Sequence, residues 1–391
     1  MKIEQIRLKN FKALKDVHIS DVPRMAVFLG ANGSGKSTLF DVFSFLQDCL
    51  VHNVRAAVMN RGGFKELRSR EATGDVEIEL KFRIQSGDPL VTYELHVGEA
   101  GGSPVVARER LQYRRGSRGR PWRFLDFSNG SGTAITNESE YEPGATYERV
   151  DQKLQSPDIL ALKGLGQFER FKAAAAFRTL IESWHVSDLH VTDARASQEA
   201  GYAEHLTTGG ENLALVAQYM FQNHRDTFGK MLAKMKARVP GVVQVEAKET
   251  EDGRIVLRFA DGAFKDPFIA RFVSDGTLRM FAYLILLHDP NPHPLLAVEE
   301  PENQLYPNLL QPLAEEFREY ADRGGQVFIS THSPDFVNGL RIEELFWLEK
   351  VDGFTRVLRA KEDQNICALM KEGDLLGALW KQRIFGNVDP Q

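Results

Sequence analysis

Apolar and polar positions along the first 50 residues predict a β-hairpin, a buried strand and a helix. Residues 2–8 alternate between polar and apolar side chains, and apolar positions recur as far as Ile19, which is the pattern of paired strands. The run Met25–Leu29 is apolar at every position, as in a strand that is covered on both faces. A glycine-rich turn follows, and apolar residues at helical spacing then predict a helix from Lys36 to about Leu50.

The middle of the chain changes from strand spacing to helical spacing. Alternating segments separated by turn residues predict an antiparallel β-region between residues 75 and 150. Residues 168–184 and 213–235 instead place apolar side chains at helical intervals. We therefore expect a first lobe over residues 1–150 and a helical insertion over residues 151–238.

Strand patterns return after residue 242 and lead into alternating helices and strands. An Asp252–Gly253 turn joins two alternating runs, which is a strong hairpin signal. The elements that follow are a helix, a strand, a helix and a strand, over residues 278–287, 295–298, 308–320 and 326–330. This order is typical of an α/β fold, so residues 239–391 are expected to form a second lobe.

Composition narrows the class of protein only slightly. With 42% hydrophobic and 26% charged residues, the chain of 391 residues has enough apolar material for a core. The formal charge of −5 neither indicates nor excludes nucleic-acid binding. Cys49 and Cys367 lie far apart, so they imply neither a disulfide framework nor a zinc site. No signal peptide and no run of about 18 apolar residues is evident, and we expect a cytoplasmic protein without a membrane partner.

A phosphate-binding loop follows the apolar strand at Met25–Leu29. Glycines in such a loop let backbone N–H groups converge on phosphate oxygens at the N-terminus of the next helix. Lys36 is expected to reach the β- and γ-phosphates of ATP, and the Ser37 hydroxyl is expected to ligate Mg²⁺. The competing interpretation is a glycine-rich turn, but the strand and helix on either side favour the loop. The expected nucleotide-binding residues are Gly30, Ala31, Asn32, Gly33, Ser34, Gly35, Lys36, Ser37 and Thr38.

Two glutamates follow the apolar run Leu295–Val298. Acids at the C-terminal end of such a strand lie where α/β sheets bind ligands. Glu299 is expected to hold Mg²⁺ and Glu300 to polarise the attacking water, because phosphoryl transfer depends on positioning and charge neutralisation. Taken alone, acids in this place are more often a solvated turn.

Two further segments suit contacts with the γ-phosphate. His332 follows the apolar strand 326–330 and could hydrogen-bond that phosphate, although a lone histidine is more often structural. Ser274, Asp275 and Gly276 precede an apolar helix, where they form either an anion-binding helix N-terminus or a simple N-cap.

One strongly basic segment bears on the choice of partners. Residues 108–123 hold seven arginines and one acid, and such stretches suit phosphate contacts with DNA or RNA. Tyr113 and Trp122 could stack on bases. The competing interpretation is a solvated hairpin loop.

In this order the motifs resemble those of ABC-type ATPases, specifically the branch with SMC-like and RecF-like heads. The resemblance is carried by LKNFKAL, GANGSGKST, VSDGT, LLAVEEPENQLYP and ISTHSPDF, over about residues 1–50 and 240–340. Within the branch the chain looks most like bacterial ATPases related to the ATPase half of overcoming-lysogenisation-defect nucleases. The implied fold is a two-lobed α/β P-loop NTPase head with an antiparallel β-region and a helical insertion.

The resemblance also implies roles for residues. Glu299 matches the metal-holding acid, Glu300 the catalytic glutamate and His332 the switch histidine. Residues 274–277 match the signature loop, which in this family contacts the γ-phosphate bound to the opposite subunit, so ATP joins a homodimer. The loop reads SDGT where transporters have SGGQ, which leaves the role of Asp275 open. Gln47 and Gln85 both remain candidates for the lid-loop glutamine.

For biological use, the resemblance favours a sensor or switch ATPase linked to nucleic acid. It implies a role in anti-phage defence or DNA repair beside a separate effector, such as a nuclease-like protein encoded nearby. The alternatives are the ATPase subunit of a membrane transporter and a DNA-repair clamp of RecF type. A complete nuclease in one chain is not expected. Related nucleases carry a metal-binding TOPRIM domain after the ATPase, and the 59 residues that follow His332 are too few for it.

Overall fold

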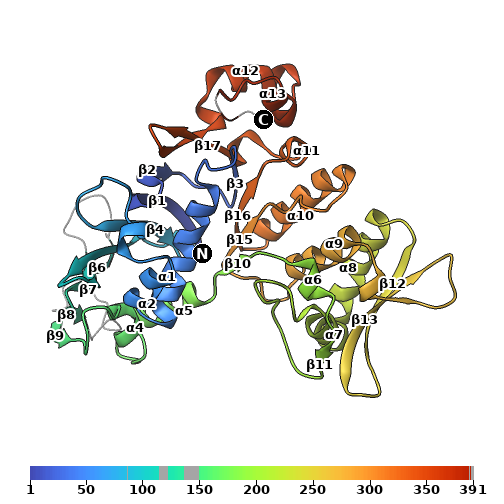
Figure 1. The fold of residues 1–391 in the computed structure, drawn as a ribbon, viewed down its shortest axis with the longest axis horizontal. Coiled ribbons are helices and arrows are strands. Elements are labelled where there is room, and N and C mark those ends of the chain that lie inside the picture. The colour runs from blue at the N-terminus through green and yellow to red at the C-terminus, as the bar shows by residue number, and fades with distance from the viewer. Residues whose placement is uncertain (86, 114–121, 136–148, 387, 389–391) are drawn as a thin grey trace. The chain divides into compact units, whose positions relative to one another are not determined.

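The computed structural model describes the chain as two compact units (Figure 1). It covers residues 1–391 except 86, 114–121, 136–148, 387 and 389–391. Unit 1 comprises residues 1–184, 343–367 and 385–391, and unit 2 comprises residues 185–342 and 368–384. In the described part of the chain, no helix combines the length and apolar content that a transmembrane segment needs.

An antiparallel sheet makes up much of unit 1. Its eight strands lie in the order β2-β1-β4-β5-β6-β7-β8-β9. The alternation that predicted these strands is visible in the burial of β4, where every second side chain is buried, as expected when one face covers a core. The strands are β1 (Lys2–Phe11), β2 (Leu14–Ser20), β4 (Val76–Arg83), β5 (Val91–Ala100), β6 (Ser103–Tyr113), β7 (Trp122–Ser128), β8 (Ser131–Ile135) and β9 (Arg149–Lys153).

A second layer of unit 1 carries the glycine-rich loop. Strand β3 (Met25–Leu29) pairs in parallel with β17 (Leu345–Val351), which pairs antiparallel with β18 (Phe354–Arg359). All five side chains of β3 are buried. Phe28 stacks on Phe346 at 5.4 Å between ring centroids and meets the edge of Phe40, on helix α1 (Lys36–Val51), at 6.2 Å. The helices α2 (Val54–Met59), α3 (Phe64–Leu67), α4 (Ala161–Leu165) and α5 (Lys172–Glu182) complete this unit.

Unit 2 contains a parallel sheet covered by helices. Strands β10 (His185–Ser187) and β16 (Gln326–Thr331) flank β15 (Leu295–Glu299), and nearly all side chains of β15 and β16 are buried. The hairpin of β12 (Val242–Glu249) and β13 (Arg254–Asp261) has the predicted Asp252–Gly253 turn. The other elements are α6 (Val191–Ala194), β11 (Gln198–Glu199), α7 (Leu213–Asn223), α8 (Arg225–Arg238), β14 (Phe268–Ile269), α9 (Asp275–Leu287), α10 (Leu310–Asp322), α11 (Pro334–Val337) and α13 (Leu376–Lys381).

Short elements connect the units or link their strands and helices. Helix α12 (Gln364–Glu372) lies where the chain passes from unit 1 to unit 2 for the second time. Four 3₁₀ turns complete the described elements, at Ala270–Phe272, Pro307–Leu309, Ile342–Glu344 and Ala360–Glu362.

The units divide the chain differently from the predicted boundaries at residues 150 and 238. Residues 151–184 belong to unit 1 because Phe177 of α5 stacks on Phe82 of β4 and packs on Tyr93, each at 4.7 Å. The buried Glu109 of β6 also accepts hydrogen bonds from the first two N–H groups of α4, and burial raises the pKa of Glu109 to about 7. Contacts with the sheet, which periodicity does not reveal, therefore set this boundary.

The helical stretch predicted over residues 213–235 is two helices. Helix α7 ends at Asn223 and α8 begins at Arg225, because His224 between them has the non-helical dihedrals φ −133° and ψ 51°. The His224 ring lies 3.2 Å from the Tyr219 hydroxyl. The apolar spacing continues across this break, so the sequence pattern could not locate it.

Candidate ATP-binding site

The glycine-rich loop joins β3 to α1 in unit 1, as predicted. Gly33 and Gly35 have φ of 77° and 105°, a left-handed backbone that favours glycine. A Cβ on Gly30 would come within 2.8 Å of the Leu348 carbonyl oxygen, so the backbone needs a glycine there. The buried members of the loop are Gly30, Ser34, Gly35 and Lys36; Ala31 and Thr38 are half-buried; Asn32, Gly33 and Ser37 are exposed.

The Lys36 ammonium lies at the centre of the loop. Its Nζ donates to the carbonyl oxygens of Gly30, at 2.6 Å, and Ala31, at 3.2 Å. Thr355 of β18 supports the loop from outside, because its hydroxyl donates to the Ser34 carbonyl at 2.7 Å and its N–H donates to the Ala13 carbonyl at 2.9 Å. The charge is therefore held where phosphate oxygens would replace carbonyl oxygens as its partners.

A polar cavity of about 610 Å³ adjoins the turn between β1 and β2 in unit 1. Arg61 is anchored there by Asp41 and Asp48, at 2.8 and 2.7 Å, and Lys12 pairs with Asp41 at 2.6 Å. The residues around the cavity are Lys12, Ala13, Arg61, Glu66, Arg68, Arg70, Glu71, Asp352, Gly353 and Phe354. The lining therefore combines four cations with three acids and the Phe354 ring, and an aromatic ring among polar groups suits a ligand that carries a flat ring.

Gln47, one of the two lid-loop candidates, is engaged within unit 1. Its amide donates to the carbonyl oxygens of Ile181 and Trp184 at 3.1 and 2.7 Å. The amide therefore fastens α1 to the end of α5, which argues against a role for it at the phosphates.

In unit 2, the two predicted acids lie at the C-terminal end of β15. Glu299 is its last residue. Glu300 has φ of 45°, which costs a non-glycine residue about 1 kcal/mol. Backbone hydrogen bonds hold that conformation, since the Glu300 N–H donates to the Ser330 carbonyl at 2.9 Å and the Asn303 N–H donates to the Glu300 carbonyl at 3.1 Å. The strained backbone thus fixes the direction of the Glu300 side chain.

His332 meets two acids at the end of β16. Its Nδ1 lies 3.3 Å from Oε1 of Glu300 and 3.6 Å from Oε1 of Glu302. The second oxygen of Glu300 accepts from the Asn303 amide at 3.1 Å. Glu300 and His332 are 33% and 46% exposed, so both remain accessible to a ligand. The structure therefore brings together Glu300 and His332, which the sequence placed 32 positions apart.

Glu302 is a member of the site that the sequence motifs did not identify. It is buried, and its Oε1 accepts from the Thr331 hydroxyl at 2.8 Å and from the His332 N–H at 2.7 Å. Burial raises the pKa of Glu302. It therefore ties the loop after β15 to the loop after β16. Its signal in the sequence is weak, since it is only the third acid after an apolar run.

The predicted signature loop begins α9. Ser274 is the N-cap, and its hydroxyl accepts from the Thr277 N–H at 3.3 Å while remaining exposed. Asp275 pairs with Arg195, whose guanidinium also donates to the Arg271 carbonyl at 2.9 Å. Gly276 lies under the Gln304 carbonyl, where a Cβ would approach to 2.8 Å. The capping interpretation is thus correct for Ser274, whose exposed hydroxyl also lies 2.8 Å from the Thr277 hydroxyl.

The basic segment 108–123 lies partly outside the described residues, since 114–121 are not described. Its described arginines pair with acids of the same sheet. Arg110 pairs with Glu94 at 3.2 Å, and Arg110, Arg108 and Arg123 all lie within 3.7 Å of Asp126. These three arginines contribute to the sheet, which favours the interpretation as an ordinary charged hairpin for this part of the segment.

The comparisons with known proteins agree with the motifs. A family described as "AAA domain, putative AbiEii toxin, Type IV TA system" matches residues 25–338. The DNA replication and repair protein RecF of Lactococcus lactis subsp. cremoris, strains MG1363 and SK11, is 27% identical over 146 residues, which are 34% of this chain and 40% of RecF. The chain thus matches less than half the length of these curated relatives.

Solved structures of SMC heads share the fold. One is an SMC head bound to the C-winged helix domain of ScpA, with a TM-score of 0.56 and 15% identity over 92% of this chain and 97% of that one. Another is an Smc head with an extended coiled coil bound to the C-terminal domain of ScpA derived from Pyrococcus furiosus. It has a TM-score of 0.51 and 14% identity over 94% of this chain and 99% of that one. At such identities the likeness shows the fold, which is that of an ABC-type ATPase head.

Proposed function

We propose that this chain binds and hydrolyses ATP. It belongs to the AAA-domain family named above and to the SMC- and RecF-like ABC-type ATPases. The observation that carries the proposal is the complete phosphate loop between β3 and α1, with the Lys36 ammonium held at its centre. Phosphate oxygens bind where backbone N–H groups and a positive helix end converge. When ATP binds, oxygens of the triphosphate replace the Gly30 and Ala31 carbonyl oxygens as hydrogen-bond partners of Lys36. The adenine base binds in the cavity lined by Lys12 and Phe354.

Mg²⁺ accompanies the nucleotide in this proposal. A hydroxyl at Ser37, exposed at the start of α1, and a carboxylate at Glu299 are hard oxygen ligands of the kind that Mg²⁺ prefers. The ion supplies charge neutralisation at the phosphates when it is bound. The residues proposed to act on the attacking water and the γ-phosphate lie in unit 2.

Glu300 and His332 act on the γ-phosphate. Glu300 accepts a hydrogen bond from the attacking water, with its direction fixed by the strained backbone and the Asn303 amide. His332 lies 3.3 Å from that carboxylate and donates to the phosphate oxygen. Glu302 positions His332 by accepting from its backbone N–H. These contacts support positioning and charge stabilisation, which provide most of the catalysis in phosphoryl transfer.

A second copy of the chain completes the site by presenting its Ser274. The Ser274 hydroxyl is exposed at the N-terminus of a helix of 13 residues, which favours an anionic partner. Exposed apolar patches commonly mark protein–protein interfaces, and several exposed apolar side chains precede Ser274 in the sequence. They are Phe264, Phe268, Ile269 and Phe272, which are 61, 40, 37 and 72% exposed. We assign this patch to the dimer that ATP stabilises.

Ser274→Arg is expected to retain ATP binding but to lose ATP-dependent dimerisation, and its hydrolysis should fall at least about tenfold. The physical reason is that the substitution replaces the hydroxyl offered to the partner's γ-phosphate by a bulky side chain. Nucleotide binding, size-exclusion chromatography with ATP and phosphate release measure the three effects.

Asn53→Ala is the matched control for Ser274→Arg. Asn53 caps α2 through a hydrogen bond from Ala56 N–H at 2.8 Å, so both variants lose a cap worth about 1 kcal/mol. The control should dimerise and hydrolyse ATP like the wild type. ATP-dependent dimerisation by Ser274→Arg would contradict the proposed role of Ser274.

The dimer is proposed to act as a switch linked to nucleic acid, in DNA repair or anti-phage defence, through a separate effector protein. Hydrolysis removes the γ-phosphate contacts and loosens such a dimer. RecF, by its name, acts in DNA replication and repair, and the family description names a toxin–antitoxin system. The solved SMC heads are bound to domains of ScpA, a precedent for a protein partner.

A further inference from the structure

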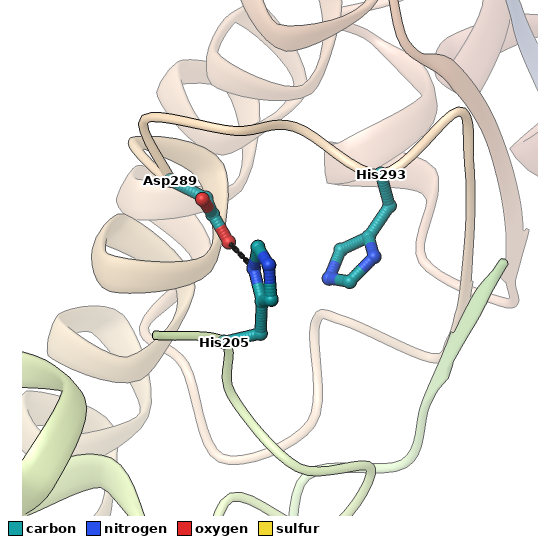
Figure 2. Close-up of side chains that lie close together, drawn as sticks. All are labelled: His205, Asp289 and His293. Carbon is teal, nitrogen blue, oxygen red and sulfur yellow. Dashed lines mark hydrogen bonds and ion pairs between the residues drawn. The ribbon is translucent and has the colours of Figure 1, made fainter. Parts of the chain in front are cut away.

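Unit 2 holds a cluster of metal-ligating side chains that the ATPase site does not use. The ligand atoms of His205, Asp289 and His293 all lie within 4.8 Å of one another. They come from three places in the sequence: the loop before α7, the turn after α9 and the loop before β15. Figure 2 shows the three side chains converging, with the His205 ring between Asp289 and His293 and one ring nitrogen of His293 directed toward it.

The Asp289 carboxylate is already oriented. Its Oδ1 accepts from the Asn291 N–H at 2.8 Å, and its Oδ2 lies 2.6 Å from Nδ1 of His205. The side chain is 6% exposed, whereas His205 is 41% exposed. One oxygen is therefore locked to the backbone while the other faces the histidines, and the cluster opens to solvent on the His205 side.

The backbone of His293 is also fixed. Pro292 and Pro294 flank it and restrict its dihedral angles. Its carbonyl accepts from the Tyr320 hydroxyl at 3.2 Å, and the Pro294 carbonyl accepts from the Gln326 N–H at 3.0 Å. The loop backbone that carries this imidazole is thus held by hydrogen bonds from α10 and β16.

A second observation points to a ligand beside the cluster. The His185 ring stacks on His293, with centroids 4.8 Å apart and ring planes 19° apart. His185 is only 7% exposed, and its Nε2 has no hydrogen-bond partner among the described residues. Buried polar atoms nearly always have a partner in the protein, in water or in an ion. The His185 nitrogen is therefore an unsatisfied polar group on the ring that stacks against His293.

We propose that His205, Asp289 and His293 bind a transition-metal ion of the zinc class. Two imidazoles and one carboxylate suit Zn²⁺ and its neighbours rather than Mg²⁺ or Ca²⁺. Bonds of 2.0–2.2 Å place tetrahedral ligand atoms about 3.3 Å apart. His205 Nδ1 and Asp289 Oδ2 lie 2.6 Å apart, and the ligand atoms of the three residues all lie within 4.8 Å of one another. These distances bracket the tetrahedral value, so side-chain rotations bring the three atoms into place.

Binding needs one proton movement. His205 donates from Nδ1 to Asp289, so its proton moves to Nε2 when Nδ1 ligates the ion. The exposed ring leaves that nitrogen accessible to water, and water completes the fourth position on the metal. The ion links the end of α9 to the start of β15. These two elements carry Ser274 and Glu299 at their other ends, so the metal stabilises the connection between them.

Zinc titration of the full chain tests this site. Metal-free protein is titrated with Zn²⁺ against a chromophoric chelator in excess Mg²⁺, which occupies sites made of oxygen ligands, and Co²⁺ absorption reports the coordination. We expect one Zn²⁺ per chain and a higher thermal unfolding temperature with the ion. His205→Ala, Asp289→Asn and His293→Ala should each weaken binding at least about tenfold. His18→Ala removes an exposed histidine of β2 and should bind like the wild type.

Two outcomes overturn the site: a wild-type chain that binds no Zn²⁺, and wild-type affinity in both His205→Ala and Asp289→Asn. Because His205 is exposed, its alanine variant is the one least dependent on the core for folding. The proposal is independent of ATP. Lys36→Ala should bind Zn²⁺ as the wild type does, so the two assignments can fail separately.

Discussion

Glu300→Gln should lower ATP hydrolysis by about 10²–10⁴-fold, the range for loss of a general base. The amide has nearly the same shape as the carboxylate but cannot accept the proton of the attacking water. The Asn303 amide lies 3.1 Å from the Glu300 side chain, and the strained backbone around it is unaffected, so ATP should still bind. The variant should therefore accumulate as an ATP-bound dimer, measurable by phosphate release and by size-exclusion chromatography.

Glu315→Gln is the matched control for this experiment. Glu315 is exposed on α10 in the same unit, and its substitution makes the same change in charge. It should hydrolyse ATP at the wild-type rate and show no trapped dimer. Hydrolysis by Glu300→Gln at the wild-type rate would remove Glu300 from the mechanism.

Lys36→Ala is expected to weaken ATP binding by about 100-fold or more. Each hydrogen bond from a charged group contributes about 1.5–3 kcal/mol, and about 2.7 kcal/mol corresponds to that factor in affinity. The ammonium is buried within the loop, where it donates to the Gly30 and Ala31 carbonyls in the absence of phosphate. Isothermal calorimetry with ATP measures the change.

Lys172→Ala controls for the loss of a positive charge in unit 1. Lys172 is exposed at the start of α5, and its variant should bind ATP normally. Thermal unfolding of both variants separates a binding defect from a folding defect. Wild-type affinity in Lys36→Ala would show that the loop is a glycine-rich turn with no role in binding.

Local patterns were sufficient for the elements around the phosphate loop. The apolar run at residues 25–29 and the helical spacing after Lys36 predicted β3 and α1 to within one residue, because glycine chemistry and burial on both faces are encoded within a few positions. The Asp252–Gly253 hairpin was equally local. Such signals do not depend on the rest of the fold.

Long-range contacts were not predictable in the same way. Strand β10 has three residues, and only its parallel pairing with β15 makes it a strand. Residues 151–184 join unit 1 because Phe177 and Glu109 contact distant strands and helices. Nothing in the spacing of a single segment encodes these pairings.

The candidate site shows the same division between local and distant information. The motifs identified Glu300 and His332 separately, but their contact and the role of Glu302 appeared only when β15 and β16 paired. The metal site was invisible to ligand spacing because His205 lies 84 positions before Asp289. Cysteine counting could not find it, since its ligands are histidine and aspartate.

Lys36 of one copy and Ser274 of another are proposed to act on the same ATP. Mixing Lys36→Ala with Ser274→Arg tests it, because neither variant alone has a complete site. In a mixed dimer of two-fold symmetry, one site combines an intact Lys36 with an intact Ser274. The mixture should regain up to about one quarter of the wild-type ATPase rate, since half of the dimers are mixed and each has one complete site. A mixture no more active than its two components would contradict the shared site.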